Sequence, residues 1–132
     1  MPFLGNFSLW LSLCFATLQF VNSIKKNSPS TFRLNKIATN GLLLCILISF
    51  FSLMYSYLIS DFSVLNVFQN SHTSKPLLYK ISAVWGNHEG SMLLWIVVLA
   101  LFNYFIFKLY NRDNSTFILK ALETQALITI GF

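Results

Sequence analysis

Residues 85–95 of the chain read WGNHEGSMLLW, and this stretch joins a short ionisable cluster directly to an apolar segment. Residues 90–107 contain no Asp, Glu, Lys or Arg, so His88 and Glu89 stand immediately before a charge-free run. Ionisable side chains are costly in hydrocarbon and ordinary in water. The stretch therefore predicts a membrane-spanning helix that begins at the headgroup boundary, with His88 and Glu89 at the membrane face.

The composition of the chain is that of a membrane protein. Apolar residues make up 55% and charged residues 10% of the sequence, whereas soluble domains average about 25% charged residues. Residues 1–24 and 37–60 are also free of charge, and a helix of either length is about 36 Å long, enough for a hydrocarbon core of about 30 Å. We predict an all-α polytopic membrane helix bundle with complete spans at about residues 3–24, 37–60 and 90–110.

A fourth apolar segment begins near Ala121 and is still apolar at Phe132. Because so short a segment cannot cross a membrane, we expect the chain to be the N-terminal part of a larger polytopic membrane domain, with its fourth span cut short at residues 121–132. A cleavable signal peptide is the alternative for the first apolar segment. The charge order disfavours it, since the first basic residue, Lys25, follows the apolar stretch instead of preceding it.

Basic residues mark the side of the membrane on which each loop lies, because short loops rich in Lys and Arg remain cytoplasmic. Seven of them flank the predicted spans on one side: Lys25, Lys26, Arg33, Lys36, Lys108, Arg112 and Lys120. Only Lys75 and Lys80 lie in the segment 61–89. We therefore predict that this segment is on the outer face. The net charge of +5 then reflects topology and not a nucleic-acid-binding surface.

The outer segment divides into three pieces. Residues 61–68 are rich in β-branched and aromatic side chains and are predicted to be extended. Residues 69–76 form a polar turn cluster that ends at Pro76, a residue well suited to open a helix. Residues 77–85 predict a short amphipathic helix whose apolar arc holds Leu77, Leu78, Ile81, Val84 and Trp85. This helix either lies flat on the outer leaflet or packs against the spans.

The ionisable cluster has a structural and a functional interpretation. In the structural one, Asn87 caps the third span, Glu89 complements the dipole of the helix, and Gly86 and Gly90 allow a sharp turn into the membrane. In the functional one, His88 and Glu89 face a pocket at the outer surface and position a ligand. A zinc protease is disfavoured, because Met92 stands where the second histidine of that motif is required.

Two cysteines limit the redox chemistry of the chain. Cys14 and Cys45 lie inside predicted spans, and neither belongs to a CxxC pair or to the CxxCH pattern of covalent haem attachment. The chain is therefore not itself expected to be a c-type cytochrome or a dithiol oxidoreductase. It contains no glycine-rich phosphate loop, which disfavours nucleotide hydrolysis.

The run at residues 85–95, together with residues 60–64, 70–71 and 76–80, resembles the N-terminal region of the CcmF family. These proteins are the polytopic component of the haem lyase in the multi-subunit cytochrome c maturation pathway of many bacteria and some mitochondria. Related assembly proteins for cytochrome c nitrite reductase share the same core. The resemblance places the following motif residues at the haem-handling face: Trp85, Gly86, His88, Glu89, Gly90 and Trp95.

The resemblance implies haem as cofactor, with its ligands outside this chain, and assigns no catalytic or metal-ligating residue here. It implies a haem chaperone, apocytochrome c and other maturation subunits as partners, besides membrane lipid. The implied location is the bacterial cytoplasmic (inner) membrane, with the mitochondrial inner membrane as alternative. Taken alone, the 132 residues are expected to be inactive.

A transporter or respiratory-complex subunit is the alternative function, in which His88 and Glu89 would serve a proton or substrate path. Such proteins carry ionisable groups inside the membrane, and the three predicted complete spans contain no Asp, Glu, Lys or Arg up to residue 107. The sequence therefore favours haem handling over transport.

Overall fold

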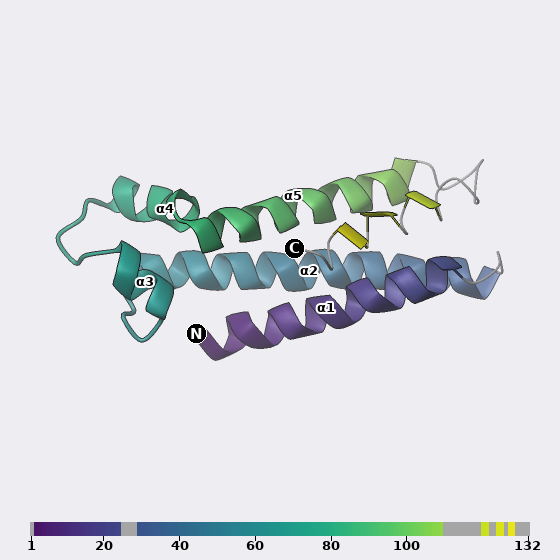
Figure 1. Ribbon diagram of the computed structural model, residues 1–132, viewed down its shortest axis with the longest axis horizontal. Helices are drawn as coiled ribbons and strands as arrows, with labels where there is room; N and C mark the ends of the chain where they lie inside the picture. Colours follow the sequence, from purple (N-terminus) through teal and green to yellow (C-terminus); the bar gives the residue numbers. More distant parts are fainter. Residues whose placement is uncertain (1, 25–28, 110–119, 122–123, 126, 129–132) are drawn as a thin grey trace.

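The computed structural model describes residues 2–24, 29–109, 120–121, 124–125 and 127–128. Three long helices, α1 (Pro2–Ile24), α2 (Pro29–Leu58) and α5 (His88–Leu109), run antiparallel to their neighbours in sequence and form an elongated bundle (Figure 1). Two short helices, α3 (Leu65–Asn70) and α4 (Leu77–Gly86), gather at one end of it. No strand occurs among the described residues, and the predicted all-α fold is confirmed.

By length and composition, the described part of the chain has three helical segments able to cross a membrane: Phe3–Asn22, Arg33–Leu58 and His88–Leu109. α2 begins at Pro29, eight residues before the predicted span at residue 37. The prediction stopped at the charged residues Arg33 and Lys36, but a helix can continue past the headgroups into water. Of the predicted fourth span, residues 121–132, only pieces lie among the described residues, and these pieces are helical.

The helices α1 and α2 approach each other closely because the residues at their contact are small. A Cβ atom on Gly41 would come within 2.8 Å of the Phe15 ring, and one on Gly5 within 3.3 Å of the Ser52 hydroxyl oxygen. The buried residues Ser8, Ser12, Ala16 and Ala38 are small as well. In lipid, where no hydrophobic effect drives helices together, such residues allow the backbones to approach closely.

A buried amide pair joins α1 to α5 in the half of the bundle away from α3 and α4. The Gln19 Nε2 donates to Asn103 Oδ1 at 3.1 Å, and Asn103 Nδ2 donates back to Gln19 Oε1 at 3.0 Å. Both residues are 0% exposed. Amides carry no charge, so the pattern of charged residues in the sequence did not predict this pair. Each amide satisfies groups of the other that lipid could not.

The turn after α2 is defined by hydrogen bonds. Ser60 has a positive φ of 54°, its N–H donates to the Tyr57 carbonyl, and the Asp61 N–H donates to the Ser56 carbonyl. This is the Schellman pattern that ends many helices. The Asp61 carboxylate then accepts bonds from the N–H and the hydroxyl of Ser63. These hydrogen bonds lower the pKa of Asp61, the side-chain bond from Ser63 most strongly.

The prediction of extended backbone over residues 61–68 was wrong, because α3 begins at Leu65. Its β-branched Val67 is 0% exposed and packs with Tyr57 and Val84 in a small core under α3 and α4. Burial of one side chain on a single helical turn thus outweighed the local preference for a strand.

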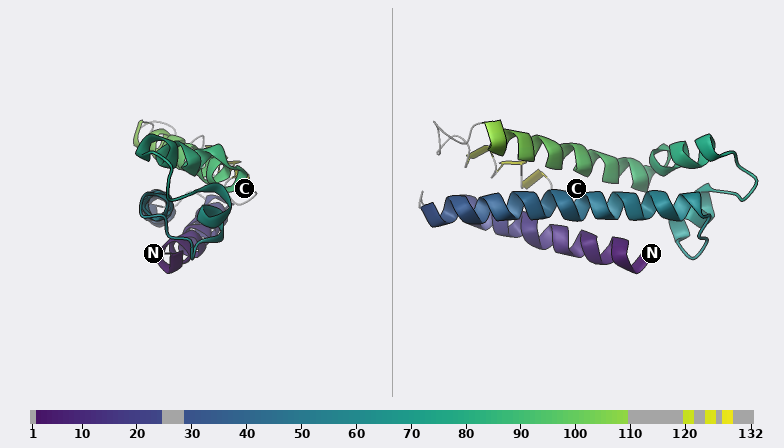
Figure 2. Two further views of the ribbon diagram at one scale, coloured as in Figure 1. Left: turned by 90° about the vertical axis from the view of Figure 1, so that its left-hand side faces the viewer. Right: turned by 180° about the vertical axis from the view of Figure 1, so that it is seen from behind.

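The predicted amphipathic helix is present as α4, with Pro76 as its N-cap. Its packing against a span is confirmed, since Val84 is buried with Tyr57, while its orientation relative to a membrane surface stays a prediction. The predicted apolar arc does not pack as a whole, because Leu77 and Leu78 are 63% and 78% exposed. Figure 2 shows α3 and α4 covering one end of the bundle, beside the C-terminal end of α2. Because the sequence predicts that this end faces outward, it is called the outer end below.

Candidate functional site at the outer end of the bundle

Asn87 is the single residue between α4 and α5. Its backbone is extended, with φ −109° and ψ 165°, and its side-chain Oδ1 accepts the N–H of Gly90 at 2.7 Å. A bond from the third residue of a helix to the side chain that precedes the helix is the ordinary N-cap. The predicted cap of the third span by Asn87 is therefore confirmed.

The side-chain nitrogen of Asn87 forms hydrogen bonds to two further helices, α2 and α4. Asn87 Nδ2 donates to the Tyr57 hydroxyl at 2.7 Å and to the Ala83 carbonyl at 2.9 Å. Tyr57 belongs to α2 and is 0% exposed. One side chain therefore fixes the ends of α2, α4 and α5 relative to one another. A tyrosine near the end of a span is a common interfacial residue, and nothing in the sequence indicated that it would meet Asn87.

The two glycines of the motif have different surroundings. Gly90 is buried against the backbone of α4: a Cβ atom there would overlap the Val84 carbonyl oxygen and lie 2.8 Å from the Val84 carbonyl carbon. A Cβ atom on Gly86 would meet nothing within 4 Å, and neither glycine has a positive φ. The sharp turn into the membrane therefore requires glycine at position 90, through close approach of two backbones, and not at position 86.

His88 and Glu89 are the first two residues of α5, and both are exposed. Glu89 lies in the first turn, where the positive end of the helix dipole favours a carboxylate. Successive residues on a helix point about 100° apart. Accordingly, Glu89 lines a cavity between the spans, whereas His88 is not among the residues that line it.

This cavity has a volume of about 560 Å³ and lies at the outer end of the bundle. Its walls come from the first turns of α1 and α5, its floor from α2, and its outer edge from the segment before α3. The lining residues are Gly5, Asn6, Leu9, Ser49, Ser52, Leu53, Ser56, Ser63, Val64, Leu65, Glu89, Met92, Leu93 and Ile96. A mostly apolar lining with a few polar groups is typical of binding sites, and Glu89 is its one charged member.

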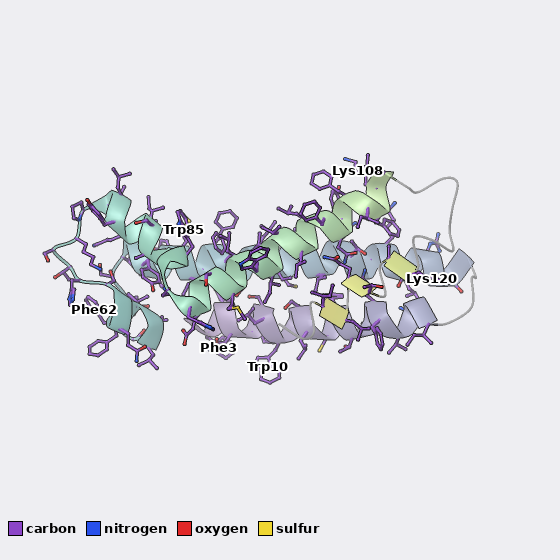
Figure 3. The ribbon with its side chains drawn as sticks, turned by 45° about the horizontal axis from the view of Figure 1, so that its top comes forward. Phe3, Trp10, Phe62, Trp85, Lys108 and Lys120 are labelled. Atoms are coloured by element: carbon purple, nitrogen blue, oxygen red, sulfur yellow. The ribbon has the colours of Figure 1, made fainter. Side chains whose placement is uncertain are left out.

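The two tryptophans of the motif do not enter the cavity. Trp85 is 43% and Trp95 59% exposed, and neither lines it. Figure 3, which labels Trp85, shows that side chain on α4 close to the corner with α5. The structure thus places Glu89 and Gly90 toward the bundle and leaves His88, Trp85 and Trp95 on its surface.

A further hydrogen bond at this end, from Lys80 Nζ to the Ser60 hydroxyl at 2.8 Å, joins α4 to the turn after α2.

The described residues contain no group of three His, Cys, Asp or Glu side chains able to hold a metal ion. His72 and His88 are both exposed, and the cavity beside Glu89 is lined by neither histidine nor cysteine. The site is a corner between α4 and α5, held by the hydrogen bonds of Asn87, on which His88 is exposed.

No family model matches the sequence. The chain is 43% identical over 136 residues to the cytochrome c-type biogenesis protein CycK of Rhizobium meliloti, an alignment that covers 98% of this chain and 20% of the relative. It is 34% identical over 132 residues to the cytochrome c-type biogenesis protein CcmF of Haemophilus influenzae, again with 98% and 20% covered. The chain belongs to the CcmF family.

The fold of this CcmF-family chain is also that of a solved relative. The structure described as cytochrome c heme lyase CcmF superimposes with a TM-score of 0.89 at 24% identity, over 97% of this chain and 22% of that one. The chain thus spans about a fifth of the length of the relatives it matches. Together with its three apolar helices, this makes it a multi-pass membrane protein of the cytochrome c biogenesis family.

Proposed function

We propose that this protein supports the attachment of haem to apocytochrome c at the outer face of the membrane, as part of a haem lyase component. The observation that carries the proposal is the 43% identity, over nearly the whole chain, to a cytochrome c-type biogenesis protein. The relatives named here are bacterial, which favours the bacterial inner membrane as its location. A haem chaperone, apocytochrome c and other maturation subunits are its proposed partners.

In this proposal the chain contributes positioning and not haem ligation. Thioether formation requires the cysteines of the apocytochrome and the haem to be held close together in one orientation. Haem supplies the reactive vinyl groups when bound, and the residues described here do not form its ligand set. The corner fixed by Asn87 and Gly90 supports a rigid platform, from which His88 would reach the outer face.

The proposed roles of the two ionisable residues differ because they point in different directions. His88, exposed at the first position of α5, would meet a partner or haem at the surface. Glu89, on the wall of the cavity, would hold the first turn of α5 in place and bind a hydrogen-bond donor there. The transporter alternative gains no support, since the buried polar side chains within the described spans are amides and hydroxyls.

The test uses a full-length family protein that carries this segment and compares three variants. His88→Ala should lower the yield of holocytochrome c while the amount of the protein in the membrane stays normal. Glu89→Gln should lower the yield as well if its charge positions a partner. If Glu89 only complements the helix dipole, a change of about 0.3–1 kcal/mol is expected, and the yield should be nearly unchanged.

His72→Ala is the matched control, because His72 is the other exposed histidine of the outer segment. Its yield should equal that of the unmodified protein. Covalent haem staining of the cytochrome measures the yield, and an immunoblot of the membrane fraction measures abundance. Normal yields for both His88→Ala and Glu89→Gln, at unchanged abundance, would mean that the motif has only a structural role at the start of α5.

A further inference from the structure

The inner half of the bundle, away from α3 and α4, buries a polar layer next to an apolar one. The apolar layer is made of Ala16, Leu42, Ile46, Val97 and Ala100. One to two turns further inward along each helix, the buried side chains are amides and a hydroxyl: Gln19, Asn35, Thr39 and Asn103. All four are at most 1% exposed. Polar groups buried this deeply need hydrogen-bond partners.

Asn35 is the member of this layer whose side chain has no protein partner among the described residues. Gln19 and Asn103 bond to each other, and the Thr39 hydroxyl donates to the backbone carbonyl of Asn35 at 2.8 Å. The Asn35 side chain is 0% exposed, yet neither its Nδ2 nor its Oδ1 has a hydrogen-bond partner in the described part of the chain. Leaving a buried donor and acceptor unpaired is costly, so such groups are nearly always bonded to protein or to ordered water.

The surroundings of Asn35 favour water over other partners. Because its side chain is fully enclosed, further chain of a longer relative could reach it only if the bundle opened. Lipid tails offer no hydrogen bonds. Arg33 and Lys36, in the same turn of α2, are charged and exposed, which indicates that this turn lies near the inner headgroups, where water is abundant. A water molecule is small, and it both accepts from the N–H groups and donates to the oxygen of a carboxamide.

The end of α1 lies beside Asn35 and offers the same water a further acceptor. The Phe15 ring lies against Gly41, and α1 and α2 are antiparallel (Figure 1). Residue 21, six positions after Phe15, is therefore about level with Asn35, six positions before Gly41. It opens the last turn of α1, residues 21–24. The last four carbonyl groups of a helix have no partner within the helix, so they can accept hydrogen bonds from water.

We propose that the Asn35 side chain binds an internal water molecule that joins α2 to the last turn of α1. The water accepts a hydrogen bond from Asn35 Nδ2, and it donates one to Asn35 Oδ1 and one to a carbonyl oxygen of residues 21–24. About three hydrogen bonds are typical of a buried water. This site holds the inner ends of two spans, as the Asn87 side chain holds the outer ends of α2, α4 and α5. It does not depend on the proposed role in haem attachment.

Water-edited solid-state NMR tests the site without changing the sequence. The 132-residue chain is uniformly labelled with stable isotopes of carbon and nitrogen and placed in bilayers. Each side-chain amide signal is assigned through the carbons of its own residue. Magnetisation is then transferred from water protons, and its arrival at each asparagine Nδ2 is followed as the mixing time increases. Asn103 is the matched control, because it carries the same amide, is also 0% exposed and has Gln19 as its partner.

The Asn35 signal should gain water magnetisation at least about fivefold faster than the Asn103 signal, because a bound water lies within about 3 Å of the amide nitrogen. A membrane-impermeant paramagnetic chelate, present on both sides of the bilayer, separates an enclosed site from an open one. The chelate is too large to enter the bundle. It should therefore broaden the Asn35 signal much less than the Nζ signal of Lys36, which is exposed in the same turn.

Two results would overturn the proposal. Equal transfer rates at Asn35 and Asn103 would mean that no water is bound to the Asn35 amide. Broadening of Asn35 to the same extent as Lys36 would mean that the amide is open to bulk water and that the site is not enclosed. Either result would leave the proposed function untouched, because that function rests on the relatives and on the outer end of the bundle.

The link to α1 has a test of its own. Asn35→Leu removes the amide that holds the water, so the last turn of α1 should open more often, and the backbone amides of residues 21–24 should exchange with deuterium at least about threefold faster. Asn40→Leu is the matched control, because Asn40 is an exposed residue of the same helix, and its exchange rates should match those of the unmodified chain. Unchanged exchange at residues 21–24 in Asn35→Leu would contradict the link between the two helices.

Discussion

Replacing Gly90 by alanine tests whether the corner between α4 and α5 is as close as the structure indicates. The new methyl group would overlap the Val84 carbonyl oxygen and meet the carbonyl carbon at 2.8 Å. The obstacle is backbone, which cannot rotate away as the end of a flexible side chain can. α4 must therefore move from α5, or the first turn of α5 must unwind.

The cost of this substitution has three parts. Overpacking a rigid site typically costs about 1–3 kcal/mol, and a backbone obstacle belongs at the upper end. Displacing Gly90 also strains its 2.7 Å bond to Asn87 Oδ1, and loss of a helix cap costs about 1 kcal/mol. Alanine is favoured over glycine inside a helix by about 1 kcal/mol, which offsets part of the loss. We expect Gly90→Ala to destabilise the protein by about 3 kcal/mol.

Gly86→Ala is the matched control, because a Cβ atom there meets nothing within 4 Å. Reversible unfolding in mixed micelles, as the mole fraction of sodium dodecyl sulfate rises, gives the free energy of unfolding for each variant. The control should be unchanged or more stable by up to about 1 kcal/mol. Equal stabilities of Gly90→Ala and Gly86→Ala would refute the close approach of α4 to α5 and, with it, the rigid platform.

Three more predictions follow from other parts of the molecule. In a cysteine-free background, Thr73→Cys should react with a membrane-impermeant thiol reagent in intact spheroplasts and Ser30→Cys only after permeabilisation; the reverse would invert the topology. Asn103→Leu should destabilise by about 1–2 kcal/mol, because it removes both hydrogen bonds between Asn103 and the buried Gln19 amide. Gln19→Leu in addition should recover part of that loss; additive losses would disprove the pairing. The hydrogen bonds from Ser63 lower the pKa of Asp61, so their stabilisation is present above the unfolded-state pKa and is lost as pH falls through the lowered value. Ser63→Ala should shift that loss to higher pH, and an NMR titration in which Asp61 does not move would contradict it.

The sequence by itself determined the class of the fold and the cap at the start of its third span. Long charge-free runs are too apolar to remain in water. In lipid, the backbone N–H and C=O groups of such a run must form hydrogen bonds with one another, and a helix provides these bonds. The cap at Asn87 was also predictable, because an N-cap depends on residues that are adjacent in the chain. The family resemblance rested on the contiguous run at residues 85–95 for the same reason.

Only the tertiary structure decided which of these residues act together. The contact of Asn87 with Tyr57 and the pair formed by Gln19 and Asn103 join positions 30 and 84 residues apart, and neither has a local sequence signal. The different roles of Gly86 and Gly90 depend on the carbonyl of Val84, which lies against position 90 and not against position 86. Residues 65–70 form a helix and not a strand, because burial of Val67 in tertiary packing outweighs a weak local propensity.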